Sequence, residues 1–236
     1  MDDPKAAFLS DVDAALKSVV PKGCTWSFSS IVDAQVPLFI DEEDSIATAV
    51  LSRQAEFRAG RSVARAALAM LGLSPVSVPR STDRRPIWPT GIVGSIAHSG
   101  GWVGALAGRS SEHIGLGIDF EPAATLSKDL QFFICNQDEI ELRNQKYMSE
   151  IPFDFALMVF VAKEAAFKAT YHLVNRYMDF KDASVIMHVT STERDCYFGK
   201  FDIKIHNTYI SNSIGMNCFT GKWFIVGNHF FAVTNI

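Results

Sequence analysis

Two short segments with acidic residues at fixed spacings constrain this chain more than any other feature. The segment Gly117-Ile118-Asp119-Phe120-Glu121 places two carboxylates at positions i and i+2, which emerge on the same face of a β-strand. Residues 160–168, Phe-Val-Ala-Lys-Glu-Ala-Ala-Phe-Lys, place Glu164 and Lys168 at i and i+4, adjacent on one face of a helix. Three carboxylates and a lysine supply what a Mg²⁺ ion that holds a pyrophosphate would need.

The helix expected around the second segment carries its carboxylate on an apolar face. Large apolar residues recur at helical spacing, at Phe153, Leu157, Phe160, Phe167 and Tyr171. Glu164 falls on this stripe, where a carboxylate is unfavourable unless it is paired or binds a metal. The alternative is that Glu164 forms an ordinary surface ion pair with Lys163 or Lys168.

The first segment is expected to lie at the end of a strand. Gly117 permits close approach of the backbone, and Pro122 ends strand pairing after Glu121. The end of a strand is a common location for ligand chemistry. Acidic residues that follow a strand also occur in solvated loops, and this is the alternative for Asp119 and Glu121.

Propensity and turn residues predict an α+β chain. Helices are expected over residues 4–20, 45–71, 126–147 and 152–172, and strands within 23–40, over 91–97, 102–107 and 114–120, and in four short runs after residue 183. Helices and antiparallel strands in separate groups favour the α+β class. The 236 residues are 48% hydrophobic and 20% charged, which leaves room for one large core or two small domains.

Positive charge is concentrated in one stretch. Between Arg53 and Arg85 the chain has seven arginines, no lysine, and only Glu56 and Asp83 as acidic residues. Arginine suits bidentate recognition of phosphate, although a solvated helix face is the alternative. The net charge of the whole chain is −4, which argues against a general nucleic-acid binder.

Cysteine usage and the first residues predict a cytoplasmic protein. The four cysteines, Cys24, Cys135, Cys196 and Cys218, are widely spaced and form no CxxC pair, so neither a zinc site nor a redox site is indicated. The acidic start of the chain lacks the apolar core of a signal peptide, and the apolar run over 155–162 is too short to span a bilayer.

The two acidic segments, in this order, resemble the hallmark patterns of the Sfp-type 4′-phosphopantetheinyl transferases, G-(I/V)-D-x-E and (W/F)-x-x-K-E-(A/S)-x-x-K. Both patterns are complete, with Val161 as a mild departure at a position where the family has a small hydroxyl or thiol residue. Residues 53–65 and 85–98 are similar to two further blocks of the enterobactin-synthetase component D subgroup. The similarity spans roughly residues 40–236.

The resemblance implies a role for each matching residue. Asp119, Glu121 and Glu164 would ligate Mg²⁺, with Mn²⁺ as the alternative. Glu164 would be the general base, and Lys168 would stabilise the leaving phosphate. Contacts with coenzyme A would come from His98, Lys163 and Lys168 at the phosphates, Arg53 and Arg61 at the 3′-phosphate, and Arg80 or Arg85 beside the adenine. Ala97 departs from the family, which has serine or threonine there.

The family fold is a pseudo-dimer of two similar α+β halves with the active site in the cleft between them. We expect residues 1–112 to contact coenzyme A and residues 113–236 to hold the metal and the catalytic groups. The implied reaction moves phosphopantetheine from coenzyme A to a serine of an apo acyl, peptidyl or aryl carrier protein, in siderophore, non-ribosomal peptide or polyketide synthesis. The enzyme is expected to be a monomer.

Two alternatives from other classes remain at this point. One is a protein that binds coenzyme A or a nucleotide and has lost catalysis, although such a protein has no need for Glu164 on an apolar stripe. The other is a different Mg²⁺-dependent phosphotransferase. The chain contains no GxxxxGK[ST] loop, which removes the commonest version of that class.

Overall fold

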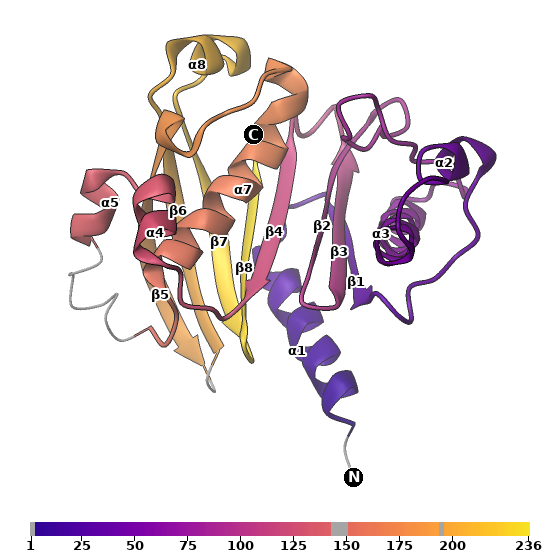
Figure 1. Cartoon of the computed structure of the whole chain (residues 1–236), viewed down its shortest axis with the longest axis horizontal. Coiled ribbons are helices and arrows are strands. Elements are labelled where there is room, and N and C mark those ends of the chain that lie inside the picture. The colour runs from indigo at the N-terminus through magenta and orange to yellow at the C-terminus, as the bar shows by residue number, and fades with distance from the viewer. Residues whose placement is uncertain (1–2, 143–150, 194–195) are drawn as a thin grey trace. The chain divides into compact units, whose positions relative to one another are not determined.

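The computed structural model describes residues 3–142, 151–193 and 196–236 (Figure 1). The chain divides into two compact units, Met1–Ile118 and Asp119–Ile236. Each unit combines an antiparallel sheet with one long helix, so the α+β class predicted from the sequence is confirmed. In both units the long helix precedes an antiparallel hairpin, which is the two-half arrangement expected from the resemblance.

The first unit is built on a three-stranded sheet with the order β1-β3-β2. Its helices are α1 (Pro4–Val19), α2 (Ile40–Asp44) and α3 (Leu51–Met70), and its strands are β1 (Thr25–Ser30), β2 (Ile92–Ser99) and β3 (Trp102–Arg109). Helix α3 lies on one face of the sheet, where Ala59, Ala64 and Ala67 are completely buried (Figure 1). Helix α1 covers the opposite face, where Phe8 packs on Phe28 and Trp102.

The second unit is built on a five-stranded sheet with the order β4-β8-β7-β6-β5. Its strands are β4 (Leu116–Pro122), β5 (Ala183–Glu193), β6 (Cys196–Ile205), β7 (Cys218–Val226) and β8 (His229–Asn235). Its helices are α4 (Lys128–Ile134), α5 (Gln137–Leu142), α7 (Phe155–Val174), α8 (Thr208–Ile214) and the 3₁₀ turn η1 (Phe180–Asp182). Strand β4 contains the last residues of the first unit and the first residues of the second.

Helix α7 has well-defined ends. The Asp154 side chain accepts hydrogen bonds from the backbone N–H groups of Ala156 and Leu157, which caps the N-terminus. Asn175 adopts the left-handed conformation with φ of 49° and ends the helix. The buried residues of α7 include the small Ala162, Ala165, Ala166 and Ala169, and also larger residues such as Met158. The larger residues of the predicted stripe, Phe160, Glu164, Phe167 and Tyr171, are only half-buried.

Several predicted elements differ from the structure. The helix expected over 126–147 is two short helices, because the chain becomes extended at Cys135, where α4 ends; the last five residues of that expectation lie outside the described residues. The helix expected from residue 45 begins only at Leu51, after the separate short helix α2. Of residues 23–40, only Thr25–Ser30 forms a strand. Helix α8 was not expected at all.

Within the described residues, no helix combines the length and the apolar character that crossing a membrane requires.

The division at residue 112 that the sequence suggested assigns the whole of β4 to the second half. The compact units share this strand instead. Both divisions leave Asp119 and Glu121 on the side of α7.

The interior of the five-stranded sheet has no room for a side chain at Gly199. A Cβ atom there would overlap the indole ring of Trp223 and the carbonyl oxygen of His188. We therefore predict that Gly199→Ala lowers the free energy of unfolding by about 1–3 kcal/mol, the usual effect of overpacking. Urea denaturation of this variant and of Lys200→Ala, at the exposed neighbour, measures the effect. Equal midpoints for the two variants would contradict the packing described.

Candidate active site

Four predicted residues of the second unit come together on two elements. Asp119 and Glu121 lie on β4, and Glu164 and Lys168 lie on α7. The Lys168 Nζ donates a hydrogen bond of 2.7 Å to Asp119 Oδ1. Asp119 is buried, with 7% of its surface exposed, while Glu121 and Glu164 are half-buried. The hydrogen bond between Lys168 and Asp119 therefore connects the strand and the helix that the two sequence segments predicted, while the roles of these residues stay predictions.

The electrostatic environment of Glu164 favours its protonated form. Burial raises the pKa of the Glu164 carboxyl above its usual value, and the neighbouring charges of Asp119 and Glu121 raise it further. The positive charge of Lys168 partly opposes this shift of the pKa. A carboxylate with a raised pKa is a stronger base than an exposed one, and general bases work best when their pKa approaches the working pH.

The donor chemistry of this cluster fits a magnesium ion, although the protein alone does not form a closed cage. Within residues 3–142, 151–193 and 196–236, no three His, Cys, Asp or Glu side chains converge closely enough to hold a metal ion. Mg²⁺ commonly uses only one or two carboxylates together with substrate phosphates and water. Asp119 and Glu121 are close enough to Glu164 for their charges to raise its pKa, so the three carboxylates lie in one region of the second unit.

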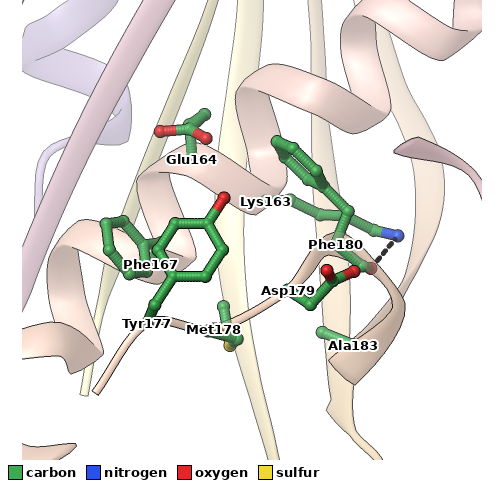
Figure 2. A pocket seen from close by; sticks show the side chains of 8 residues that line it. All are labelled: Lys163, Glu164, Phe167, Tyr177, Met178, Asp179, Phe180 and Ala183. Atoms are coloured by element: carbon green, nitrogen blue, oxygen red, sulfur yellow. Dashed lines mark hydrogen bonds between the residues drawn. The ribbon is translucent and has the colours of Figure 1, made fainter. Parts of the chain in front are cut away.

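A small pocket opens beside Glu164 (Figure 2). Its lining comes from α7, from the segment that follows it and from the start of β5: Lys163, Glu164, Phe167, Tyr177, Met178, Asp179, Phe180 and Ala183. The free space holds about one water molecule. Tyr177 is 63% exposed and packs on Phe167 with ring centroids 5.6 Å apart. The pocket therefore borders the candidate base and has one exposed aromatic residue in its wall.

Lys163 does not fit its expected role as a phosphate ligand. Its side chain is 1% exposed, and Nζ donates to the carbonyl oxygens of Ile134 and Phe180 and to Glu139 Oε2, at 2.8–2.9 Å. An ammonium group has three N–H donors, and all three are used here. The sequence could not show this, because Glu139 lies 24 residues away from Lys163, on the separate short helix α5.

In the first unit, the Arg61 side chain is buried and its orientation is fixed by its neighbours. The residue is 6% exposed, its Nε donates to the Val78 carbonyl at 2.7 Å, and its guanidinium lies 3.8 Å from the centre of the Phe57 ring. Burial lowers the pKa of Arg61 to about 10, the charge of Glu42 opposes that shift, and three neighbouring arginines add to it. The guanidinium is therefore fixed in orientation and lies in a region of concentrated positive charge.

Arg53 and His98, two of the residues expected to contact coenzyme A, lie side by side. Arg53 Nη1 is 2.9 Å from His98 Nε2 and 3.0 Å from Glu56 Oε2. His98 is exposed near the end of β2, on the same strand face as Ile96, which packs towards α3, whereas the preceding Ala97 is 2% exposed. A serine or threonine hydroxyl at position 97 would therefore be buried in this chain.

The two arginines expected near the adenine differ in their surroundings. Arg80 Nη2 donates to the Ser45 carbonyl at 2.7 Å, and the charge of Arg80 lowers the pKa of Arg61, which places Arg80 with the positive cluster. Arg85 pairs with Asp83 at 3.3 Å on the surface. The structure thus groups Arg80 with Arg61 electrostatically, while Arg85 has its own carboxylate partner.

Glu42 was not identified from the sequence, yet it organises the arginine cluster. Its carboxylate is fully buried and accepts hydrogen bonds from Arg65 Nη1 at 2.8 and 3.0 Å. It also accepts from the backbone N–H of Val78, the residue whose carbonyl binds Arg61. The acidic run that contains Glu42 looked like an ordinary helix start, and only its burial sets it apart.

Comparison with protein families supports both units. A model described as the 4′-phosphopantetheinyl transferase N-terminal domain matches residues 41–108, and one described as the 4′-phosphopantetheinyl transferase superfamily matches residues 115–212. The first match contains the arginine cluster and His98. The second contains Asp119, Glu121, Glu164 and Lys168.

Individual relatives are named as the same class of enzyme. The chain is 31% identical to the 4′-phosphopantetheinyl transferase Npt of Nocardia iowensis over 186 residues, 78% of this chain and 82% of the relative. It is 34% identical to PptT of Mycobacterium tuberculosis over 64% of this chain and 66% of the relative. Similarity to enterobactin synthase component D of Salmonella typhimurium, at 35%, covers 56% and 54%. These matches do not single out the component D subgroup.

The burial of Glu42 leads to a prediction for the first unit. Glu42→Gln preserves the shape of the side chain and removes the negative charge that pairs with Arg65. The Arg65 side chain is only 12% exposed. Removal of one partner of a buried pair leaves the other uncompensated, so we expect a loss of about 3 kcal/mol or more in unfolding free energy. Chemical denaturation provides the measurement, with Glu43→Gln at the exposed neighbour as the control. If both variants unfold at the same denaturant concentration, Glu42 is not the organising residue.

Proposed function

The chain belongs to the 4′-phosphopantetheinyl transferase family of enzymes, and on that premise we propose that it transfers phosphopantetheine from coenzyme A to a serine hydroxyl of an apo carrier protein, with Mg²⁺. The observation that carries the proposal is the cluster in the second unit, where a carboxyl of raised pKa lies with two further carboxylates and a lysine. The released product is adenosine 3′,5′-bisphosphate. The carrier belongs to siderophore, non-ribosomal peptide or polyketide synthesis, and the enzyme acts as a monomer in the cytoplasm.

The proposed chemistry is a displacement at the β-phosphorus of coenzyme A. The serine oxygen forms a bond to phosphorus, the bond to the adenosine 3′,5′-bisphosphate oxygen breaks, and the serine proton passes to Glu164 directly or through a water. Glu164 is proposed for this role because it is half-buried on α7, one helical turn before Lys168, which binds Asp119. Lys168, which binds Asp119, would donate to the phosphate oxygens as the leaving group gains charge.

Magnesium would be held by Asp119, Glu121 and Glu164 together with the pyrophosphate of the substrate. When bound, it would neutralise the pyrophosphate and stabilise negative charge on the phosphate oxygens. The donor set supports this assignment, since carboxylates and phosphate oxygens are the ligands that Mg²⁺ prefers. Mn²⁺ accepts the same donors and remains the alternative ion.

The first unit would bind the nucleotide end of coenzyme A. Arg53 and Arg61 are proposed to hold the 3′-phosphate and His98 to contact the phosphates of coenzyme A, with Arg80 or Arg85 beside the adenine. The concentration of positive charge around Arg61 supports a site for a dianion, and the fixed orientation of its guanidinium suits a phosphate. Lys163 has no part in this proposal, because its three donors are already engaged.

Incubation with coenzyme A, Mg²⁺ and an apo carrier protein tests the function directly. Intact-mass spectrometry of the carrier should show the addition of one phosphopantetheine group. The addition should disappear with EDTA and with a carrier whose acceptor serine is replaced by alanine. A carrier that stays unmodified, while the protein still binds coenzyme A, would indicate a binding protein without catalysis.

The first kinetic prediction concerns the general base. Glu164→Gln keeps the side-chain volume and removes the proton acceptor, so kcat should fall by about 10²–10⁴-fold, the usual effect of losing a positioned base. Initial rates with saturating coenzyme A and carrier measure this effect. Glu43→Gln, on the surface of the first unit, serves as the control and should retain the wild-type rate. A Glu164→Gln enzyme with wild-type kcat would remove Glu164 from the chemistry.

The second kinetic prediction concerns the 3′-phosphate. Arg61→Ala should raise the KM for coenzyme A by about tenfold or more, because a hydrogen bond to a charged group contributes about 1.5–3 kcal/mol. The KM for dephospho-coenzyme A should change much less, since that substrate lacks the phosphate in question. Arg58→Ala on the same helix is the matched control. Equal losses on the two substrates would place Arg61 elsewhere on the ligand.

A further inference from the structure

The Lys163–Glu139 pair is the most completely buried ion pair among the described residues. The two side chains are each 1% exposed, and Nζ lies 2.9 Å from Glu139 Oε2. Burial lowers the pKa of Lys163, and the charge of Glu139 opposes that shift. Both charged groups are shielded from water. The three N–H donors of Lys163 are all used within the protein, so none is left for a ligand.

This pair contacts several segments at once, which hydrogen bonds from Asn136 and Lys181 also join. Lys163 binds the Ile134 carbonyl at the end of α4 and the Phe180 carbonyl in η1, and Figure 2 shows the contact with Phe180. Glu139, on α5, accepts from the backbone N–H groups of Asn136 and Val185, both at 2.6 Å. One ion pair therefore joins α7 to α4, α5, η1 and the first residues of β5.

The joined segments border the catalytic carboxylate. Lys163 directly precedes Glu164 on α7, and Figure 2 shows the two side chains leaving the helix in different directions. The segment that Lys163 holds, Met178 to Phe180, lines the pocket beside Glu164, as does Ala183 at the start of β5. A rotation of α7 that released Lys163 from its acceptors would also move Glu164. The same rotation would change the wall of the pocket beside Glu164.

We propose that the Lys163–Glu139 pair is a positioning device that fixes the rotation of α7 and the adjoining pocket wall, and so sets the placement of Glu164. The inference rests on the proposed function, because Glu164 is taken as the base. A buried ion pair is often no more stabilising than apolar residues of the same volume, but it demands one specific arrangement of its partners. Misplacement of a catalytic group by about 1 Å can reduce a rate by about 10²-fold, so an exact arrangement matters here.

This role differs from a phosphate contact in the kinetic constants that it controls. A lysine that binds coenzyme A phosphates contributes to substrate affinity, so its removal raises KM. A lysine that orients a neighbouring base contributes to the chemical step, so its removal lowers kcat and leaves KM for coenzyme A close to that of the wild type. Substitution of Glu139 tests the same pair independently, because a carboxylate is no candidate for phosphate binding.

The experiment compares wild type, Lys163→Met, Glu139→Gln and the double variant, with Lys204→Met at an exposed position of β6 as the matched control. Each protein is first assayed for thermal unfolding, and kinetics are measured well below the lowest midpoint, so that all molecules are folded. The measured constants are kcat and KM for coenzyme A and for the carrier. Should Lys163→Met fail to fold, Glu139→Gln and the double variant, in which neither charge is left unpaired, decide the question.

We expect Lys163→Met and Glu139→Gln each to lower kcat by about tenfold or more, with KM for coenzyme A within about twofold of wild type. Because both residues act through one pair, the double variant should lose less than the product of the single losses. A raised KM with an intact kcat in Lys163→Met, or folded variants with wild-type kcat, would overturn the positioning role alone. An inactive wild-type enzyme would overturn the proposed function and this role with it.

Discussion

Close packing of a helix rich in small residues against an antiparallel sheet is the interaction on which both units depend. In α7 the four alanines Ala162, Ala165, Ala166 and Ala169 are completely buried, and in α3 the corresponding residues are Ala59, Ala64 and Ala67. Small side chains let the helix axis approach the sheet, and interiors tolerate little change in volume at such contacts. Of the candidate residues on these helices, Glu164 and Lys168 are half-buried, whereas Arg61 is 6% exposed.

Each unit also contains one buried carboxylate that ties irregular segments to its long helix. Glu42 binds Arg65 of α3 and the backbone of Val78, and Glu139 binds Lys163 of α7 and the backbone of Val185. Both carboxylates are on short helices that have few regular contacts of their own. The polar groups of neighbouring loops are satisfied by these charges, as buried polar groups require. The same pattern therefore stabilises the surroundings of both proposed sites.

Local spacing was enough to single out the candidate residues that lie on β4 and α7, and their roles stay predictions. The i, i+2 carboxylates of β4 and the i, i+4 residues of α7 were recognised because strand and helix periodicity determine which face each residue occupies. Arg53 and His98 were named only through family resemblance, and the structure brings them within 2.9 Å. Whether these residues act as proposed stays a prediction.

The remaining features depend on contacts that no local pattern contains. Lys163 was expected at a phosphate because the family pattern implies it, but its partner Glu139 is brought to it by the fold. Glu42 is likewise defined by a contact with Arg65, 23 residues away. The break between α4 and α5 was missed because residues 126–147 have ordinary helix propensity, while the structure uses Cys135 and Asn136 in an extended connection.

The environment of Arg61 has a consequence for how tightly an anion can be bound. A surface arginine samples many rotamers, and ordering such a side chain on binding costs conformational entropy of about 2 kcal/mol at most. Arg61 has already lost that freedom, because Phe57 stacks on its guanidinium and the Val78 carbonyl holds its Nε. The ordering was completed during folding, so an arriving anion meets a donor that needs no further arrangement.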